Sequence, residues 1–326
     1  MRLTAASSPQ IRSGDNVKVT MGDVILALVP IAVISVIYYG MRALILIMIS
    51  VICCVAFEYL YRRVFGRSRS IGDFSAIITG FIIAYNMPVT VPLWLPVVGS
   101  FFAIIIVKQI FGGIGKNIFN PAVAGILFLT VSWPSYMSTF PLPYNPEPLF
   151  STPTGFETGI PVQAALKAAS MPPSNKLEML GGYTPGNLGT AFIIIIVIGG
   201  LYLLYRRIIN WQIPVSFLGA VALAAAIFPR SPSGRLDSVF YELTSGSVIF
   251  VAIYMATDPV TSPVTGRARF IFGFGCGVFT VLLRYFGGYP EGAYFAILLM
   301  NPFVLALDRL TWKLRVRGGK MLYAKE

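Results

Sequence analysis

The chain alternates between long apolar runs and short polar connections. An apolar run of about 17 to 25 residues is long enough to cross a bilayer as a helix. Ten runs approach this length and predict ten membrane-spanning helices, at 23–40, 43–60, 72–87, 92–111, 119–138, 189–205, 213–229, 246–257, 269–286 and 292–308. The third and the eighth are short and end in proline, as in "NMPVTVP" and "ATDPVTSP". Broken segments of this kind are tolerated at membrane depth where they line a cavity or pack on protein.

The two halves of the chain repeat each other. "AYNMPVTVP" at the end of the third run resembles "MATDPVTSP" at the end of the eighth, and "IFNPAVAG" in the fifth resembles "LLMNPFVLAL" in the tenth. Because each half holds five runs, an odd number, the second half is inverted relative to the first. We therefore expect an all-α polytopic membrane protein with two inverted five-helix repeats and broken helices, as in secondary transporters and channels. Chance recurrence of Asn-Pro and Pro-Val-Thr in a proline-rich chain is the alternative.

The distribution of positive charge predicts the orientation. With the N-terminus in the cytoplasm and ten crossings, 19 of the 25 Lys and Arg residues fall on cytoplasmic pieces and six on outer pieces, as the positive-inside rule requires. The predicted parts are a cytoplasmic N-terminal segment (1–22), a first repeat (23–138), an extracytoplasmic loop (139–188), a second repeat (189–308) and a basic cytoplasmic tail (309–326). Both termini are then cytoplasmic, and the long polar loop lies outside.

Composition excludes several classes of protein. Hydrophobic residues make up 56% of the chain, charged residues 12%, and the mean hydropathy is +0.75, so an ordinary soluble domain is excluded. The net charge of +12 would suit nucleic acid, but in a membrane protein it reflects cytoplasmic loops that face anionic lipid. We therefore expect a lipid membrane, and no nucleic acid, as a partner. The polar N-terminal stretch is not a cleavable signal peptide.

The side chains available for chemistry are few. The chain has no histidine, and its three cysteines lie in apolar runs without a metal-binding spacing. A metal site is therefore not expected, and any redox chemistry must come from a bound cofactor.

Two carboxylates are candidates for an ion pathway. Asp258 ends the short eighth run beside prolines, and Glu291 lies in "RYFGGYPEGAYFAILLMN", where glycines and proline break the helix and free backbone carbonyls. The alternative for both is a place at a span end among headgroups. We expect Glu58 and Asp308 to form surface pairs with nearby arginines, and Asp73 to cap a helix.

Two glycine-rich stretches could approach a cofactor. "FGGIGKNIFNP" (111–121) combines glycines, which free backbone amides for an anion, with the charge of Lys116. It lacks the full phosphate-loop signature, and tight helix packing explains it equally well. Lys116, Asn117 and Asn120 are the candidate cofactor-binding residues here, and Gly186 is the candidate in "GGYTPGNLGT" (181–190).

Four stretches together resemble one family over nearly the whole chain. They are "SSPQIRSGDNVKVTMGDVILALVP", "GGIGKNIFNPAVAGILFLTVSWPSYM", "MATDPVTSPVTGRARFIFGFGCGV" and "RYFGGYPEGAYFAILLMNPFVLALDR". They are similar to the RnfD/NqrB family of membrane subunits. RnfD belongs to the Rnf complex, an ion-pumping ferredoxin:NAD+ oxidoreductase, and NqrB belongs to the sodium-translocating NADH:quinone oxidoreductase.

The resemblance implies a subunit of a six-subunit redox pump in the prokaryotic inner membrane. Its partners would be RnfA, RnfB, RnfC, RnfE and RnfG, and its fold would resemble that of urea transporters. It would carry FMN, joined through a phosphoester to a threonine in a loop outside the membrane, and riboflavin is a second candidate cofactor. It would relay electrons, and rearrangement of its halves would couple the relay to Na+ or H+ movement.

The flavin attachment motif departs from the pattern of the family. That pattern is Ser/Thr-Gly-Ala-Thr, whereas the matching stretch here reads "TGFETGIPVQAALK". One alignment puts Ile160, which has no hydroxyl, at the acceptor position. A shifted gap makes Thr158 the acceptor, with Gly159 beside it, and Thr154, followed by Gly155, is the next candidate. We expect Thr158 to carry the FMN.

The leading expectation is therefore a membrane electron carrier within a redox-driven translocase. A channel or transporter without a redox cofactor is the alternative, because inverted five-span halves also suit that class. A scaffold for neighbouring subunits is the third class, and it applies if Ile160 occupies the acceptor position.

Overall fold

The computed structural model describes residues 17–66, 71–113, 115–143, 158–168, 170–172, 175–289 and 291–318. In these ranges the fold is helical, and the single strand-like contact is an antiparallel bridge between Pro141 and Thr158. The all-α fold class predicted from the sequence is confirmed for this part of the chain.

The first half contains five helical segments in the order that the apolar runs predict. α4 continues directly into a π-helical stretch, and a short 3-10 turn, Ile71–Asp73, precedes α3. The helices are α1 (Val17–Tyr39), α2 (Met41–Val64), α3 (Ser75–Tyr85), α4 (Leu95–Phe101) with the π-helical stretch Phe102–Gln109, and α5 (Pro121–Ser132). π-helical geometry is rare in proteins as a whole, and where it occurs it is often found at a functional site.

The second half follows the same order. Its third segment is broken, because α11 and the helix after it meet at an angle of 63°. The helices are α9 (Ile193–Tyr205), α10 (Gln212–Ile227), α11 (Arg235–Thr244), α12 (Val248–Phe250) with the π-helical stretch Val251–Met255, α13 (Gly266–Phe286), and α14 (Ala293–Met300), which continues into α15 (Val304–Gly318). The bend lies between Thr244 and Val248, at the start of the eighth run, and not at the prolines that end this run, where the sequence predicted the break.

Not every segment is long enough to cross a bilayer alone. Within the described ranges, four helices have the length and hydropathy of a membrane span, and the bent pair adds a fifth. Five shorter apolar helices, Ser75–Tyr85, Leu95–Gln109, Pro121–Ser132, Ile193–Tyr205 and Gln212–Ile227, fall inside other predicted runs. A polytopic membrane protein is therefore supported, while ten complete crossings and the likeness to urea transporters stay predictions.

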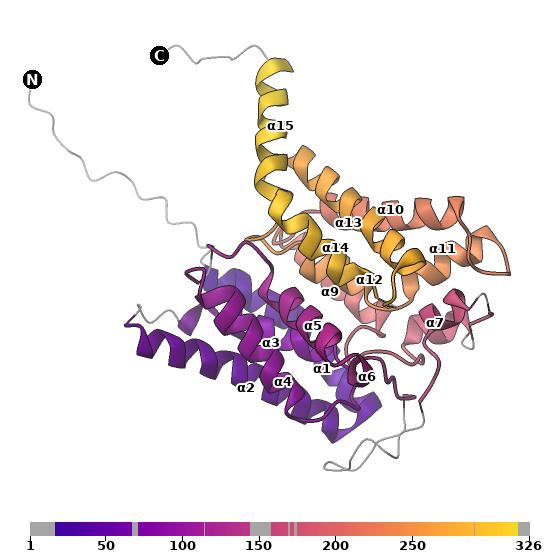
Figure 1. The fold of residues 1–326 in the computed structure, drawn as a ribbon, viewed down its shortest axis with the longest axis horizontal. Coiled ribbons are helices and arrows are strands. Elements are labelled where there is room, and N and C mark those ends of the chain that lie inside the picture. The colour runs from indigo at the N-terminus through magenta and orange to yellow at the C-terminus, as the bar shows by residue number, and fades with distance from the viewer. Residues whose placement is uncertain are drawn as a thin grey trace, which may run out of the picture.

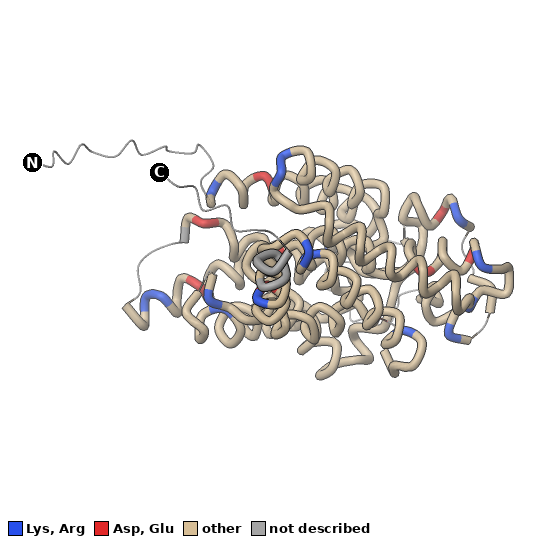
Figure 2. Tube along the Cα trace, turned by 90° about the horizontal axis from the view of Figure 1, so that it is seen from above, with Lys and Arg blue, Asp and Glu red and all other residues tan. Residues whose placement is uncertain are grey.

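The charged residues gather towards the two ends of the molecule. Figure 2 shows a middle zone of the trace that is almost free of Lys, Arg, Asp and Glu. Many apolar side chains of the helices face outward, such as Ile37 on α1, Ile198 on α9 and Leu223 on α10, each more than half exposed. An apolar exterior of this kind suits lipid or neighbouring subunits, not water.

The two halves lie side by side, with α1 next to α9 and α5 next to α14 (Figure 1). The repeated motifs meet at this contact. The side-chain amide of Asn301 is oriented so that both its groups are satisfied, and its oxygen then accepts from the backbone N–H of Asn120 (3.0 Å). The side-chain Nδ2 of Asn120 donates to the Met255 carbonyl (3.2 Å). Tyr294 donates to Asn86 Oδ1 (2.7 Å). The motifs that resemble each other in sequence therefore join the two halves.

The long loop packs on the second half. Its described residues include two short helices, α7 (Val162–Lys167) and α8 (Lys176–Gly181), and α6 (Pro134–Met137) precedes it. Val162, Leu166 and Met179 form a small apolar cluster with Tyr241 of α11. The loop is thus a packed layer over one end of the second half. The predicted part boundaries stay predictions.

Candidate functional site

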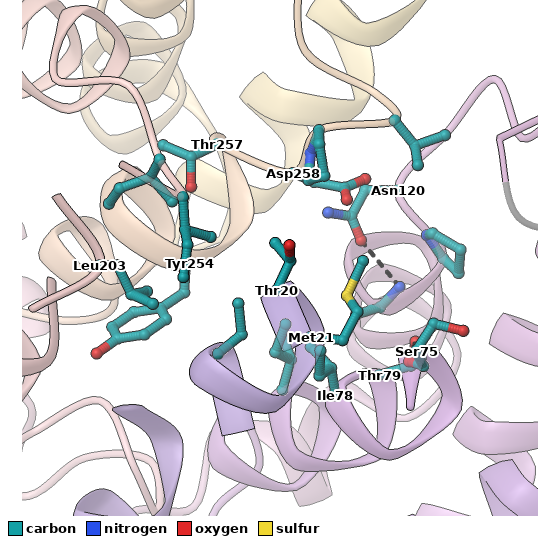
Figure 3. Close-up of a pocket in the computed structure, with 18 of the residues that line it drawn as sticks. Thr20, Met21, Ser75, Ile78, Thr79, Asn120, Leu203, Tyr254, Thr257 and Asp258 are labelled. Atoms are coloured by element: carbon teal, nitrogen blue, oxygen red, sulfur yellow. Dashed lines mark hydrogen bonds between the residues drawn. The ribbon is translucent and has the colours of Figure 1, made fainter. Parts of the chain in front are cut away.

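A cavity lies between the two halves at the end where α1 and α3 begin. It has about 840 Å³ of empty space, a volume that includes open solvent at its mouth, and its wall is mostly apolar. Figure 3 shows Thr20 and Met21 of α1 with Ser75, Ile78 and Thr79 of α3, and across from them Leu203, Tyr254, Thr257 and Asp258 of the second half. We call this space the inner cavity, because each of these elements meets it at an end that the charge pattern assigns to the cytoplasm.

The inner cavity brings together three of the site residues that the sequence predicted. Asn117, Asn120 and Asp258 all line it. Asn120 Oδ1 caps α5 by accepting from the backbone N–H groups of Ala122 and Val123, so its place is fixed by the helix that it starts. Asn117 is 9% exposed, and its Oδ1 has no hydrogen-bond partner in the described structure. A buried acceptor without a partner is suited to a ligand that carries an N–H or O–H donor.

Lys116 is not part of this wall. Its side chain is exposed, and its Cδ lies so close to Gly112 that a Cβ there would be 2.8 Å from it. Among the described residues, the cation that lines the inner cavity is Lys108, at the end of the π-helical stretch 102–109. Lys116 does not line the inner cavity, and the cofactor role expected for it stays a prediction.

Lys108 belongs to a buried network of charges in the first half. Lys108 Nζ donates to Glu58 Oε2 (2.8 Å) and to Ser75 Oγ (2.6 Å), and the Glu58 and Lys108 side chains are 2% and 3% exposed. Arg62 and Gln109 donate to the other carboxylate oxygen of Glu58. The expected pairing of Glu58 with a nearby arginine is confirmed, since Arg62 is its partner, but the expected surface location is wrong. α2 turns the Glu58 side chain inward, and three donors offset its burial.

Asp258 holds the turn that follows the π-helical stretch 251–255. Thr261 Oγ1 donates to Asp258 Oδ2 (2.8 Å), and the Ser262 N–H donates to the Asp258 carbonyl. The carboxylate is thus both a turn residue and part of the wall of the inner cavity. Its role in an ion pathway stays a prediction.

Asp73 and Asp308 both accept from backbone N–H groups near the start of a helix. Asp73 accepts from the N–H and the hydroxyl of Ser75, the first residue of α3, but the N-cap position of α3 is Phe74, which has no side-chain cap. The carboxylate thus binds the first N–H of the helix from one position before the N-cap. Asp308 of α15 accepts from the N–H groups of Val264 and Thr265 before α13. Asp308 therefore joins two segments, and the predicted surface pair with arginine is not what the structure shows.

Two adjoining hollows lie at the opposite end, under the long loop. They have about 500 and 690 Å³ of empty space, volumes that include open solvent, and they share Phe140, Asn187 and Glu291 in their walls. We call them together the outer pocket. Gly186 lines one hollow, and Asn86 and Tyr294 line the other. Asn187 is 6% exposed, and its Oδ1 also lacks a partner among the described residues, so this pocket too offers a buried acceptor.

Thr158 lies beside the outer pocket with its side chain exposed. Its backbone pairs with Pro141, and the Gly159 N–H donates to the Phe140 carbonyl (3.0 Å). Gly159 packs so tightly on Pro185 that a Cβ would lie 2.2 Å from the proline ring, so a larger residue does not fit. Ile160 is 64% exposed. Thr154 and Gly155 lie outside the described residues.

Glu291 is held by the start of α12 and by a buried arginine. Ser247 donates to it from its backbone N–H (3.1 Å) and its hydroxyl (2.9 Å), and Arg284 Nη2 lies 3.6 Å from Oε2. Gly246 has a positive φ of 67°, and a Cβ there would collide with the carboxylate. The Glu291 side chain is 13% exposed, so it lies inside the fold.

Behind Glu291 is a network that the sequence analysis did not single out. Arg284 of α13 donates to Glu242 of α11 (3.0 Å) and to the carbonyls of Glu242 and Ser245, with both charged side chains fully buried. Gln163 of α7 donates to Glu242 and to Ser245. A sequence signal existed, because an arginine inside the run "GVFTVLLRYF" needs a buried partner.

One further ion pair ties the loop to the second half. Lys176 of α8 donates to Asp237 of α11, and this hydrogen bond raises the pKa of Lys176 above its ordinary value. Within the described ranges, no group of three or more Cys, Asp or Glu side chains could hold a metal ion.

The chain is similar to a defined family over almost all of its length. The model of the "NQR2, RnfD, RnfE family" matches residues 4–317. The chain is 38% identical to the D-subunit of the Na(+)-translocating ferredoxin:NAD(+) oxidoreductase complex of Acetobacterium woodii, across 98% of this chain and 96% of that protein. It is 36% identical to the D-subunit of the proton-translocating ferredoxin:NAD(+) oxidoreductase complex of Clostridium ljungdahlii, across 94% of each chain. It is 32% identical to the D-subunit of the ion-translocating oxidoreductase complex of Halorhodospira halophila, across 93% and 92%.

Proposed function

Because the chain belongs to the NQR2, RnfD, RnfE family, we propose that it is the RnfD member of an Rnf-type complex that couples electron transfer between ferredoxin and NAD+ to ion translocation. The observation that carries this proposal is the match to three D-subunits over more than nine-tenths of this chain. The partners are the other subunits of the complex and the inner membrane, with both termini of this chain in the cytoplasm. The ferredoxin and NAD+ sites belong to those other subunits.

FMN linked to Thr158 is the first cofactor of this proposal. The exposed hydroxyl of Thr158 can form the phosphoester, and its position is fixed by the bridge to Pro141 and by the packing of Gly159 on Pro185. The outer pocket lies next to this position, and its buried Asn187 acceptor suits a ring that carries an N–H donor. A flavin in this place supplies reversible electron transfer, which no side chain here provides.

Riboflavin in the inner cavity is the second cofactor of this proposal. Apolar side chains such as Ile78, Leu203 and Ile253 line the space where a flat ring would pack. The Asn117 Oδ1 would accept from the ring N–H, and Lys108 would donate to a ring carbonyl. The two sites would lie at opposite ends of the helices, as a relay across the membrane requires.

Ion coupling is the third part of the proposal. Asp258 and Glu291 each follow a helix break and each line one of the two spaces, so both can respond to a change of charge there. Two of the relatives reported above are named for different ions, the one from A. woodii for Na+ and the one from C. ljungdahlii for protons. The coupling residues proposed here suit either cation, because carboxylates bind both.

A channel without a redox cofactor is the competing function. Purification through a tag on this chain separates the two. We expect a yellow preparation with a flavin absorbance spectrum that contains the other subunits of the complex. A colourless protein that purifies alone and conducts solutes in liposomes would contradict the proposal.

A further inference from the structure

Lys108 is the charged group that the inner cavity exposes to a ligand from the first half. The whole residue is 2% exposed. It lies at the end of a π-helical stretch, where the irregular helix turns the side chain into the wall of the cavity. Its ammonium has three N–H donors, and two are taken, by Glu58 Oε2 and by Ser75 Oγ. Among the described residues no acceptor takes the third, so one donor remains for a ligand.

In the ion pair between Lys108 and Glu58, the cation is the partner that lines the inner cavity. Glu58 accepts from Lys108, Arg62 and Gln109, so the carboxylate is shared and does not neutralise Lys108 alone. Glu58 is not part of the cavity wall, whereas Lys108 is. On the other side of the cavity the charged group is Asp258. A ligand between them therefore lies close to one cation and one carboxylate in a poorly hydrated space, where charges interact strongly.

We propose that Lys108 sets the reduction potential of the ring in the inner cavity by stabilising its reduced, negatively charged form. This inference rests on the flavin proposed for that cavity. Each electron that the ring accepts without a proton adds one negative charge, and the electron comes from the redox partners of the complex. In this role Lys108 transfers no proton to the ring and acts through its charge and its remaining hydrogen bond. Glu58, which lies on the far side of Lys108 from the cavity, partly neutralises the positive charge of Lys108 and so opposes this stabilisation.

The opposition between Lys108 and Glu58 separates this role from a structural one. Removal of Lys108 should favour the oxidised ring, and removal of the Glu58 charge should favour the reduced ring. A loss of packing at either residue would weaken ring binding in the same direction for both. The sign of the change in potential is therefore diagnostic.

The test uses the full-length chain in detergent with Thr158→Val, so that the inner cavity holds the sole flavin. Potentiometric titration of the retained flavin is compared among Lys108→Met, Lys108→Gln and Glu58→Gln. Both Lys108 variants should lower the equilibrium ratio of reduced to oxidised ring at least tenfold, which is a fall of 59 mV in the reduction potential of a one-electron couple. Glu58→Gln should change the potential in the opposite direction. Lys18→Met, which removes an exposed cation at the same end of the molecule, should change it little.

Three results would overturn the proposal, and they differ in what else they contradict. If both Lys108 variants keep the flavin at an unchanged potential, Lys108 does not set it, and the flavin site itself stands. If Lys108→Gln retains the wild-type potential while Lys108→Met does not, hydrogen bonding and not charge is responsible. If the Thr158→Val chain releases no flavin on denaturation, the proposed cofactor of the inner cavity fails, and the role of Lys108 fails with it.

Discussion

The inner cavity and the outer pocket use the same kind of buried ion pair with opposite polarity. At the inner cavity, the cation Lys108 lines the wall and the carboxylate Glu58 lies behind it. At the outer pocket, the carboxylate Glu291 lines the wall and the cation Arg284 lies behind it. Asp258 lines the inner cavity as well, so the fold presents a cation and a carboxylate to the inner space, whereas the charged group among the described lining residues of the outer pocket is the carboxylate Glu291. The difference predicts that a ring which gains electrons is favoured at the inner end.

The two spaces also differ in how a cofactor would be held. The outer one adjoins an exposed hydroxyl on Thr158, whereas the inner one offers buried acceptors and donors but no exposed threonine of this kind among its described lining residues. The outer site therefore suits a covalent link, and the inner site suits a ligand held by packing and hydrogen bonds alone.

The largest effect that tests this difference is the loss of the covalent flavin. Thr158→Val keeps the shape of the side chain and removes the oxygen that the phosphoester needs. We expect this variant to assemble in the complex and to show no in-gel flavin fluorescence after denaturation. Thr154→Val should keep the fluorescence. A fluorescent Thr158 variant together with a dark Thr154 variant would move the acceptor by one Thr-Gly pair.

The second effect concerns the stability of the two ion pairs. Arg284→Met removes the cation between two carboxylates, and breaking a fully buried pair costs about 3–5 kcal/mol. Glu242 keeps Arg230 Nη1 (3.0 Å) and Gln163 in this variant, but Glu291 loses its cation. Lys108→Met should cost less, because Glu58 keeps Arg62 and Gln109 and no second carboxylate loses its partner. Thermal unfolding in detergent should therefore give a lower melting temperature for the Arg284 variant. The reverse order would mean that Glu242 is well satisfied by Arg230 and Gln163 alone.

The third effect is a loss of coupling at the two wall carboxylates. Glu291→Gln removes the charge that faces Arg284 but can still accept from Ser247, and Asp258→Asn can keep the turn with Thr261. Both variants should lower redox-driven ion uptake into vesicles several-fold more than they lower flavin content. Normal pumping by both would limit these residues to their structural contacts.

The smallest effect belongs to the exposed pair on the loop. The hydrogen bond to Asp237 raises the pKa of Lys176 from its ordinary 10.5, so the stability from this pair is present at neutral pH and is lost as the pH rises through the raised pKa. Lys176→Met should therefore melt slightly below the wild type at pH 8, with normal flavin fluorescence. The difference should disappear above the raised pKa and in high salt. A large effect at pH 8 would make this pair a main anchor of the loop.

The sequence predicted the helices better than the contacts between them. Each of the ten apolar runs contains a helix. These helices could be predicted because a long apolar run can be recognised from local composition and length, without knowledge of its partners. Asp73 was predicted to cap a helix from its position before an apolar run, and it accepts from the first backbone N–H of α3, although the N-cap itself is Phe74. The network of Glu58 and Lys108 was missed, because its partners are 50 residues apart and the adjacent Arg62 suggested a simple surface pair.

The outer network was missed for a related reason. Arg284 and Glu242 are 42 residues apart, and their contact depends on the bend between α11 and α12, which no local pattern specifies. Of the predicted site residues, Asn117, Asn120 and Asp258 meet at one end, and Gly186 and Glu291 meet at the other. The sequence analysis grouped Asn117 and Asn120 in one glycine-rich stretch, and only the packing of the two halves shows that Asp258 shares their space and that Gly186 shares one with Glu291.

The central claim, two flavins held in two different ways, is tested most directly by mass spectrometry of the purified chain under native and denaturing conditions. We predict a denatured chain heavier than its sequence by one FMN less one water, with the added mass on the peptide that contains Thr158. We also predict one further flavin that is present in the native ion and released on denaturation. A chain of unmodified mass that releases no flavin would contradict the account at both ends of the molecule.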